Sequence, residues 1–93
     1  MVSRLAIEIA SLIPSLTVGL SSGPGGVGFI YTQGERQIGV VRNMNHKVWR
    51  IDGDPPGYPF KSEAEATLEM FRRVPDSQDY QGAVLRAIGV VGV

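Results

Sequence analysis

The sequence predicts an α+β fold in a single domain over residues 1–93: an antiparallel meander of three to four strands with an N-terminal helix and two C-terminal helices packed on one face. Helical periodicity occurs near both ends of the chain, and strand-like segments separated by turn residues fill the middle. Prolines close the first two predicted helices. With 43% hydrophobic and 19% charged residues, 93 residues are typical of one globular domain.

The segment from Arg4 to Ile13 predicts the N-terminal helix. Its polar residues recur at i, i+4 and i+7 and its apolar residues lie on another face, and Pro14 ends the periodic pattern. Ile7 and Ile13 widen the apolar surface beyond a single stripe. We therefore expect this helix to be buried on two sides or to pack on another subunit.

The middle of the chain predicts the strands. Four segments are rich in β-branched or aromatic residues, and turn residues separate them. Because short turns join neighbouring strands in an antiparallel arrangement, these segments predict a meander. They are Ser15–Leu20, Val27–Gln33, Gln37–Met44 and Lys47–Asp52.

The segment Gly53–Pro59 is dense in proline and glycine, so it cannot be a central strand. The clearest helix signal follows it, because Ser62 and Glu65 form the S-x-x-E pattern of a capping box. Phe71 belongs to the core stripe of this helix, and Pro75 stops it.

The segment from Asp76 to Val93 allows two interpretations. Tyr80, Val84 and Ile88 have helical spacing, whereas the closing "IGVVGV" has the β-branched content of a strand. We favour a helix from about Ser77 to about Ala87. A domain of this size has a thin core, and its apolar end helices can be covered within one chain or between two, so we expect a homodimer.

The sequence does not favour a cleaved signal peptide or a membrane-spanning segment. The apolar N-terminus has the length of a signal peptide, but Glu8 falls in the middle of what would be its hydrophobic region. No charge-free run of eighteen apolar residues is present. The sequence therefore predicts a cytoplasmic protein with no cleaved signal and no membrane span.

The stretch "SSGPGGVGFIY" contains Gly23, Gly25 and Gly28 in the spacing G-x-G-x-x-G. In a dinucleotide-binding fingerprint a strand precedes the glycines and a helix opens directly after them. Here a strand follows, and no lysine with serine or threonine completes a phosphate-binding loop. We expect no cofactor, and instead a mobile turn with positive φ at one or more of Gly23, Gly25 and Gly26.

The residue types exclude several chemistries. Without cysteine the chain has no disulfide and no thiolate metal site, and a single histidine, His46, excludes a multi-histidine site within one chain. Asp52 and Asp54 offer oxygen ligands to a hard cation, but the prolines after them break the spacing of a calcium loop, so we interpret them as turn formers. No nucleophile elbow or serine–lysine pair is present. The sequence predicts no catalytic residue, no metal site and no enzymatic activity.

The stretch from Val41 to Arg50 is the most basic in the chain, with Arg42, Lys47 and Arg50 beside Trp49. Strand alternation places Trp49 with Lys47 on one face and Arg50 on the other. A single tryptophan in such a strand is more often a core anchor than a base-stacking platform. If Trp49 is buried, Arg42 and Arg50 can share the opposite face.

From Val27 to Val74, the strand order, Trp49 near the third strand and "PFKSEAEA" before a helix resemble the three-stranded DNA-binding domains at the amino termini of phage-type integrases. The likeness covers about half of the chain. It implies that Arg42, Lys47 and Arg50 on the exposed sheet face would read the major groove. Nine basic and nine acidic residues balance, so nucleic-acid binding would need such a local patch.

Taken together, these patterns favour a non-enzymatic protein-binding module, such as a phage or mobile-element accessory protein that inhibits a host protein by occupying its surface. The expected partner surface combines the exposed sheet face with "DGDPPGYPF", where prolines restrain Tyr58 and Phe60 near Asp54. Tyr58 is the expected anchor, although it can also fold back onto the core. The alternative is a sequence-tolerant nucleic-acid binder that uses Arg42, Lys47 and Arg50.

Overall fold

A computed structural model describes residues 1–24, 26–45, 48–55 and 57–92. Its strands form an antiparallel sheet in the order β1-β2-β3-β4. This arrangement confirms the predicted α+β meander with an N-terminal helix and two C-terminal helices. The elements are α1 (Arg4–Leu12), β1 (Leu16–Gly23), β2 (Gly26–Gln33), β3 (Arg36–Asn45), β4 (Val48–Ile51), α2 (Glu63–Arg72) and α3 (Gln78–Val91).

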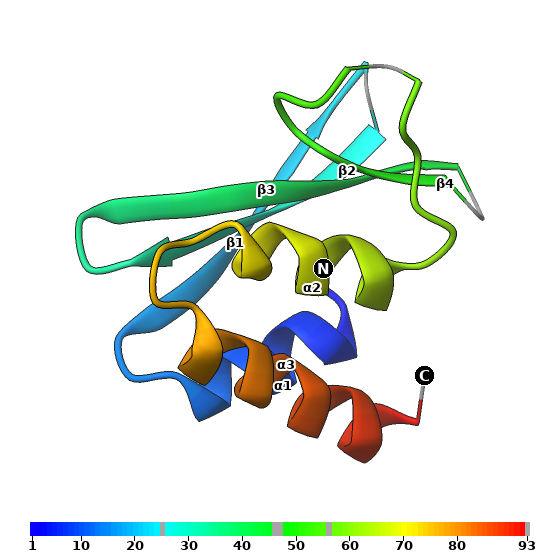
Figure 1. Ribbon diagram of the computed structural model, residues 1–93. Helices are drawn as coiled ribbons and strands as arrows, with labels where there is room; N and C mark the ends of the chain where they lie inside the picture. Colours follow the sequence, from blue (N-terminus) through cyan, green and yellow to red (C-terminus); the bar gives the residue numbers. More distant parts are fainter. Residues whose placement is uncertain (25, 46–47, 56, 93) are drawn as a thin grey trace.

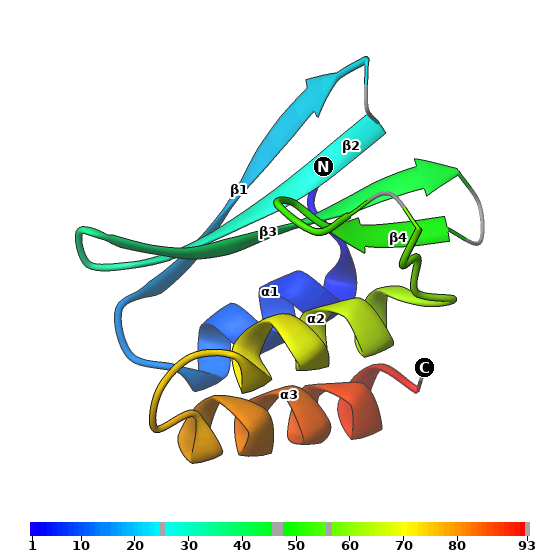
Figure 2. The same ribbon diagram turned by 45° about the horizontal axis from the view of Figure 1, so that its top comes forward.

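The helices all lie on one side of the sheet (Figures 1 and 2). Helix α1 contacts β1, and α2 contacts β3 and β4. Helix α3 contacts α1 and α2, so it forms a further layer on the side away from the sheet (Figure 2). In the described part of the chain, no helix covers the outer face of the sheet.

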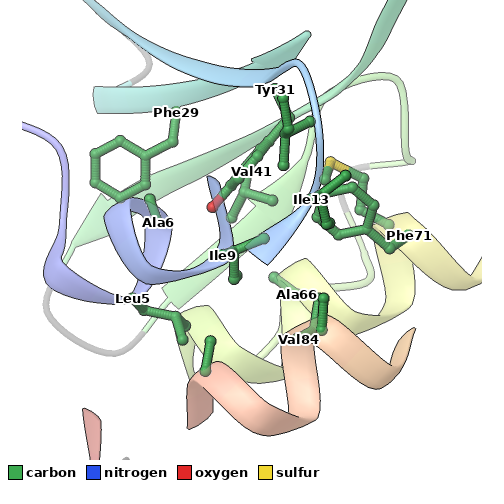
Figure 3. Packing of buried hydrophobic residues seen from close by; sticks show 14 of the residues in the cluster. Leu5, Ala6, Ile9, Ile13, Phe29, Tyr31, Val41, Ala66, Phe71 and Val84 are labelled. Atoms are coloured by element: carbon green, nitrogen blue, oxygen red, sulfur yellow. The ribbon is translucent and has the colours of Figure 1, made fainter. Parts of the chain in front are cut away.

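The core lies between the sheet and the helices (Figure 3). Tyr31 of β2 and Val41 of β3 are fully buried beneath the sheet, where they face Phe71 of α2. The Tyr31 and Phe71 rings meet edge to face, with centroids 5.3 Å apart and an interplanar angle of 75°. Phe71 also stacks on Tyr80 of α3 at 5.3 Å and 21°. This aromatic column connects all three layers.

Helix α1 is tied to α2 at its N-terminus. The Ser3 hydroxyl accepts a hydrogen bond from the Ala6 amide at 3.1 Å and donates one to the Glu63 carboxylate. Burial raises the pKa of Glu63 above its ordinary value. The helix packs against both β1 and α3, which confirms its expected burial on two sides, yet Ile7 remains 52% exposed.

Helix α2 begins at its predicted cap, whereas α3 continues about one turn beyond the predicted end near Ala87. The Glu65 amide donates to the Ser62 hydroxyl at 3.2 Å, which confirms the cap. The last segment is helical as far as Val91, so the strand interpretation of its end is wrong. Ala83, Val84 and Ala87 are buried at helical spacing against the other helices, and the helix they anchor continues through the β-branched residues that follow, although Val90 is 59% exposed.

Strands β1 and β2 are longer than the sequence predicted. Their pairing continues to Gly23 opposite Gly26, so the connection is much shorter than the expected glycine loop. Gly26 has φ of +100°, which confirms the predicted positive φ, whereas Gly25 lies outside the described residues. A Cβ on Gly26 would lie 2.0 Å from the Asn43 carbonyl oxygen of β3.

None of the helices in the described residues is long and apolar enough to cross a lipid bilayer.

The conformation of Gly26 makes a direct prediction. Gly26→Ala should lower the free energy of unfolding by about 3 kcal/mol or more, because a side chain there is strained and also clashes with backbone. Gly23→Ala is the matched control, since a Cβ at Gly23 meets nothing within 4 Å. Denaturant unfolding of both variants measures the difference, and equal losses would contradict this account of the hairpin.

Candidate protein-binding groove

The segment between β4 and α2, residues 52–60, is fixed to the sheet at both ends. We call it the proline loop. The Asp54 amide donates to the Ile51 carbonyl at 3.1 Å. At the other end, Phe60 pairs with Trp49 through two backbone hydrogen bonds, of 2.7 and 2.9 Å. The loop therefore leaves and rejoins the sheet at β4.

An ion-pair network fixes the proline loop to α2. The Arg73 guanidinium, just after α2, donates to both carboxylate oxygens of Asp54, at 2.6 and 3.2 Å. Its Nε donates to the Glu69 carboxylate at 3.0 Å. These bonds to Asp54 and Glu69 raise the pKa of Arg73 further. Because the Asp54 side chain is only 14% exposed, this pair lies in a partly shielded place.

Arg50 of β4 contacts the loop from the sheet side. Its Nη2 donates to the Asp54 carbonyl at 3.0 Å. Its Nε is buried and has no hydrogen-bond partner within the described residues. Asp54 is thus bound through its side chain by Arg73 and through its backbone by Ile51 and Arg50.

A groove of about 540 Å³ lies between the proline loop and the C-terminal half of α2. Tyr58 lines it and is 67% exposed, whereas Phe60 is half-buried. The structure therefore brings together three of the predicted partner-binding residues, Asp54, Tyr58 and Phe60. The lining residues are Asp54, Pro55, Gly57, Tyr58, Pro59, Phe60, Glu69 and Arg73.

The chemistry of this groove suits binding. Asp54 and Glu69, its two carboxylates, are ion-paired with Arg73. A carboxylate held in this way is a poor general base. Proline and aromatic side chains supply apolar contact area at low cost in conformational entropy. Among the described residues, no three histidine, aspartate or glutamate side chains form a group that could hold a metal ion.

Of the basic residues predicted as partner-binding, Arg42 and Arg50 do not line this groove. Arg42 of β3 is directly opposite Arg50 in the sheet register, as expected for residues on one face. Arg42 donates to both Asp52 oxygens, at 3.0 and 2.9 Å, and to the Gly26 carbonyl at 3.1 Å. The hydrogen bond from Arg42 lowers the pKa of Asp52. Both arginines are therefore engaged inside the molecule, and Lys47 lies outside the described residues.

Trp49 packs on the core, as the alternation predicted. It is half-buried beside the hydrophobic cluster, and its ring centroid lies 6.0 Å from that of Phe29. This places Trp49 on the helix side of the sheet with the buried Val41 and Ile51, whereas Arg42 and Arg50, which alternate with them along the strands, lie on the outer side. The tryptophan is not part of a basic surface.

One glycine of the G-x-G-x-x-G spacing, Gly28, has a structural explanation. A Cβ on Gly28 would lie 3.1 Å from both the Arg42 guanidinium carbon and a Val40 methyl carbon. Gly28 thus lets the Arg42 side chain lie closely over β2 and reach Asp52. Gly26, beside the motif positions, is required by its positive φ, whereas a Cβ at Gly23 would meet nothing within 4 Å and Gly25 lies outside the described residues.

Two groove residues were not predicted as site residues. Arg73 was recognisable only as a basic residue at the end of a helix, and Glu69 had no distinguishing signal. A second hollow of about 520 Å³ was also missed; it lies between the end of α1, the β2–β3 turn and the α2–α3 connection, with Asp76, Asp79 and Tyr80 in its wall. The residues that line each hollow come from distant parts of the sequence, so local sequence patterns do not indicate that they are neighbours.

Comparisons with protein-family models, curated proteins and solved structures find no match to this chain. The resemblance to integrase amino-terminal domains gains no support from them and stays a prediction.

The ion-pair network predicts the effect of removing Arg73. Arg73→Ala should lower the free energy of unfolding by about 1 kcal/mol and change the fluorescence of Trp49, because the loop that pairs with this tryptophan is released. Arg72→Ala is the control, since Arg72 makes one contact of 3.4 Å with Glu69. Equal effects of the two substitutions would contradict a role for Arg73 in fixing the loop.

The Arg42–Asp52 pair predicts a pH dependence. A lowered carboxyl pKa in the folded protein adds stability above the unfolded pKa of about 3.9, and this stability disappears as the pH falls through the folded value. The side chain of Asp52 is 41% exposed, so the contribution should not exceed about 1 kcal/mol.

Unfolding titrations of wild type and Asp52→Asn measure this contribution. The difference between them should be constant above about pH 5 and decrease below it. Arg42→Gln removes the other half of the pair. It should therefore be less stable than wild type above about pH 5, and this difference should also decrease at lower pH. A difference that persists unchanged at low pH would rule out this source.

Proposed function

We propose that this protein is a non-enzymatic protein-binding module that presents Tyr58 to a partner protein from the edge of the groove. The observation that carries the proposal is the convergence of a highly exposed tyrosine, a proline-restrained loop and a fixed ion-pair network at one place. A partner side chain can enter the groove while Tyr58 packs into the partner. The occupant we favour is an extended segment of the partner with an apolar side chain for the groove.

Rigidity supports Tyr58 as the anchor. Hot-spot residues are enriched in tyrosine, and they contribute most when little entropy is lost on binding. Phe60 and Asp54 hold the loop on either side of Tyr58, through the sheet and through Arg73 respectively. Tyr58 is 67% exposed, so it is not folded back onto the core.

The internal use of the arginines favours a protein partner over a nucleic acid. Phosphate binding requires cations that are free to replace counterions. Arg42 and Arg50 already bind Asp52 and the Asp54 carbonyl. Tight occupation of a partner's surface is also how an inhibitory accessory protein of a phage or mobile element would act.

A photo-crosslinking amino acid in place of Tyr58, expressed in the native cell, tests this proposal. We expect one discrete protein adduct, which is retained after nuclease treatment and absent when the crosslinker replaces Leu85 on α3, 57% exposed. The adduct identifies the partner for affinity measurements. An adduct that nuclease removes would instead support the nucleic-acid alternative.

With the partner identified, Tyr58→Ala should weaken binding by about 2 kcal/mol, or roughly thirtyfold, without changing the unfolding transition. Tyr58→Phe separates the role of the ring from that of the hydroxyl, and Leu85→Ala is the matched surface control. Calorimetry provides the affinities. A folded Tyr58→Ala protein with full affinity would remove Tyr58 as the anchor.

A further inference from the structure

Strand β1 forms one margin of the sheet, and its outer edge is unpaired in the described residues (Figure 2). The backbone of Ser15 bonds to Gly34 across the sheet, and antiparallel bonding alternates along a strand. Every second residue of β1 therefore directs its N–H and C=O away from β2. These residues are Leu16, Val18, Leu20 and Ser22; the Leu16 amide is already occupied, because it donates to the Ile13 carbonyl at 3.2 Å. At the usual rise per residue, this edge is about 27 Å long.

This edge has none of the features by which proteins prevent edge-to-edge pairing. Exposed edges are normally interrupted by lysine, proline or a bulge, or are covered by another segment. The β1 sequence "LTVGLSSG" has no charge and no proline, and its register with β2 is regular throughout. The opposite margin, β4, is partly covered by Phe60, which pairs with Trp49.

The layer beneath this edge is apolar and exposed as well. Helix α1, which packs against β1, exposes Ile7 by 52%. On β1 itself, Leu20 belongs to the helix side of the sheet, opposite Phe29, yet it is 47% exposed. The unpaired backbone is thus accompanied by apolar side chains in both layers.

We propose that the β1 edge pairs antiparallel with the β1 edge of a second copy of this chain, so that one continuous sheet crosses a twofold axis. A twofold axis brings identical residues together, which requires a surface that does not repel itself. An uncharged strand meets this requirement. Helix α1 also meets this requirement, because it carries both a positive and a negative side chain, Arg4 and Glu8. An antiparallel arrangement of the two α1 helices about the axis can bring Arg4 of each copy near Glu8 of the other.

A second copy would cover both the unpaired backbone of β1 and the exposed apolar side chain of α1. An extended peptide added to the edge would satisfy the backbone of β1 but leave the Ile7 side chain of α1 in water. A second domain brings its own α1 beneath the paired strands, and the Ile7 side chains of the two copies then cover one another. This dimer leaves the proline loop free, because that loop adjoins β4 at the other margin.

Light scattering coupled to size exclusion, and sedimentation over a concentration series, test the dimer. We expect a wild-type dimer, and for Leu20→Lys a dissociation constant raised by about tenfold or more, because two like charges are placed near the axis. Leu85→Lys is the matched control on α3 and should remain dimeric. Tyr58→Ala should also remain dimeric, so failure of the proposed function and failure of the dimer are distinguishable.

Hydrogen exchange of the wild-type protein keeps the proposal testable if Leu20→Lys does not fold. The amides of Val18 and Leu20 point to the free edge, so they should exchange quickly in dilute monomer and slowly in dimer. A monomer at every concentration, or a dimer that Leu85→Lys disrupts and Leu20→Lys does not, would overturn the proposal. So would a dimer in which the Val18 and Leu20 amides stay unprotected.

Discussion

Phe71 provides the contact on which the three-layered arrangement depends. It is fully buried, meets Tyr31 of the sheet edge to face, and stacks on Tyr80 of α3. Helix α3 contacts mainly the other helices, so this column is its aromatic connection toward the sheet. Burial of a large aromatic side chain stabilises a small domain by several kcal/mol, and here one ring serves two interfaces.

Because three helices lie on one side, a chain of 93 residues can build a core but cannot also cover the other face and the margins of its sheet. The two margins differ. The β4 margin is occupied in part by Phe60, and the proline loop that leads to it forms the groove with α2. No strand pairs with the β1 margin within the part of the chain that the structure describes. One fold therefore offers a groove with an exposed aromatic residue at one margin and an unprotected strand at the other.

The balanced charges are arranged in local pairs. Asp52 and Asp54 were interpreted as turn formers, but in the structure they also bind Arg42 and Arg73 respectively. These pairs fix the two ends of one turn, to the outer sheet face and to α2. Each pair has one partner that is well exposed, Asp52 by 41% and Arg73 by 45%, so its contribution to stability is modest, and the main effect of the pairs is to give the proline loop a defined position.

The sequence by itself determined the order of helices and strands, the cap at Ser62 and a positive φ within the stretch Gly23–Gly26, because each depends on residues close in the chain, and it favoured packing of Trp49 on the core. It also identified Tyr58 as an exposed aromatic candidate. The sequence favoured a helix to about Ala87, and only the structure shows that it continues to Val91, beyond the buried positions Ala83, Val84 and Ala87 that anchor it on the other helices.

Only tertiary structure brought Arg73 to the proline loop and left β1 at a free margin. Such meetings depend on the three-dimensional path of the chain. Local sequence patterns do not specify that path.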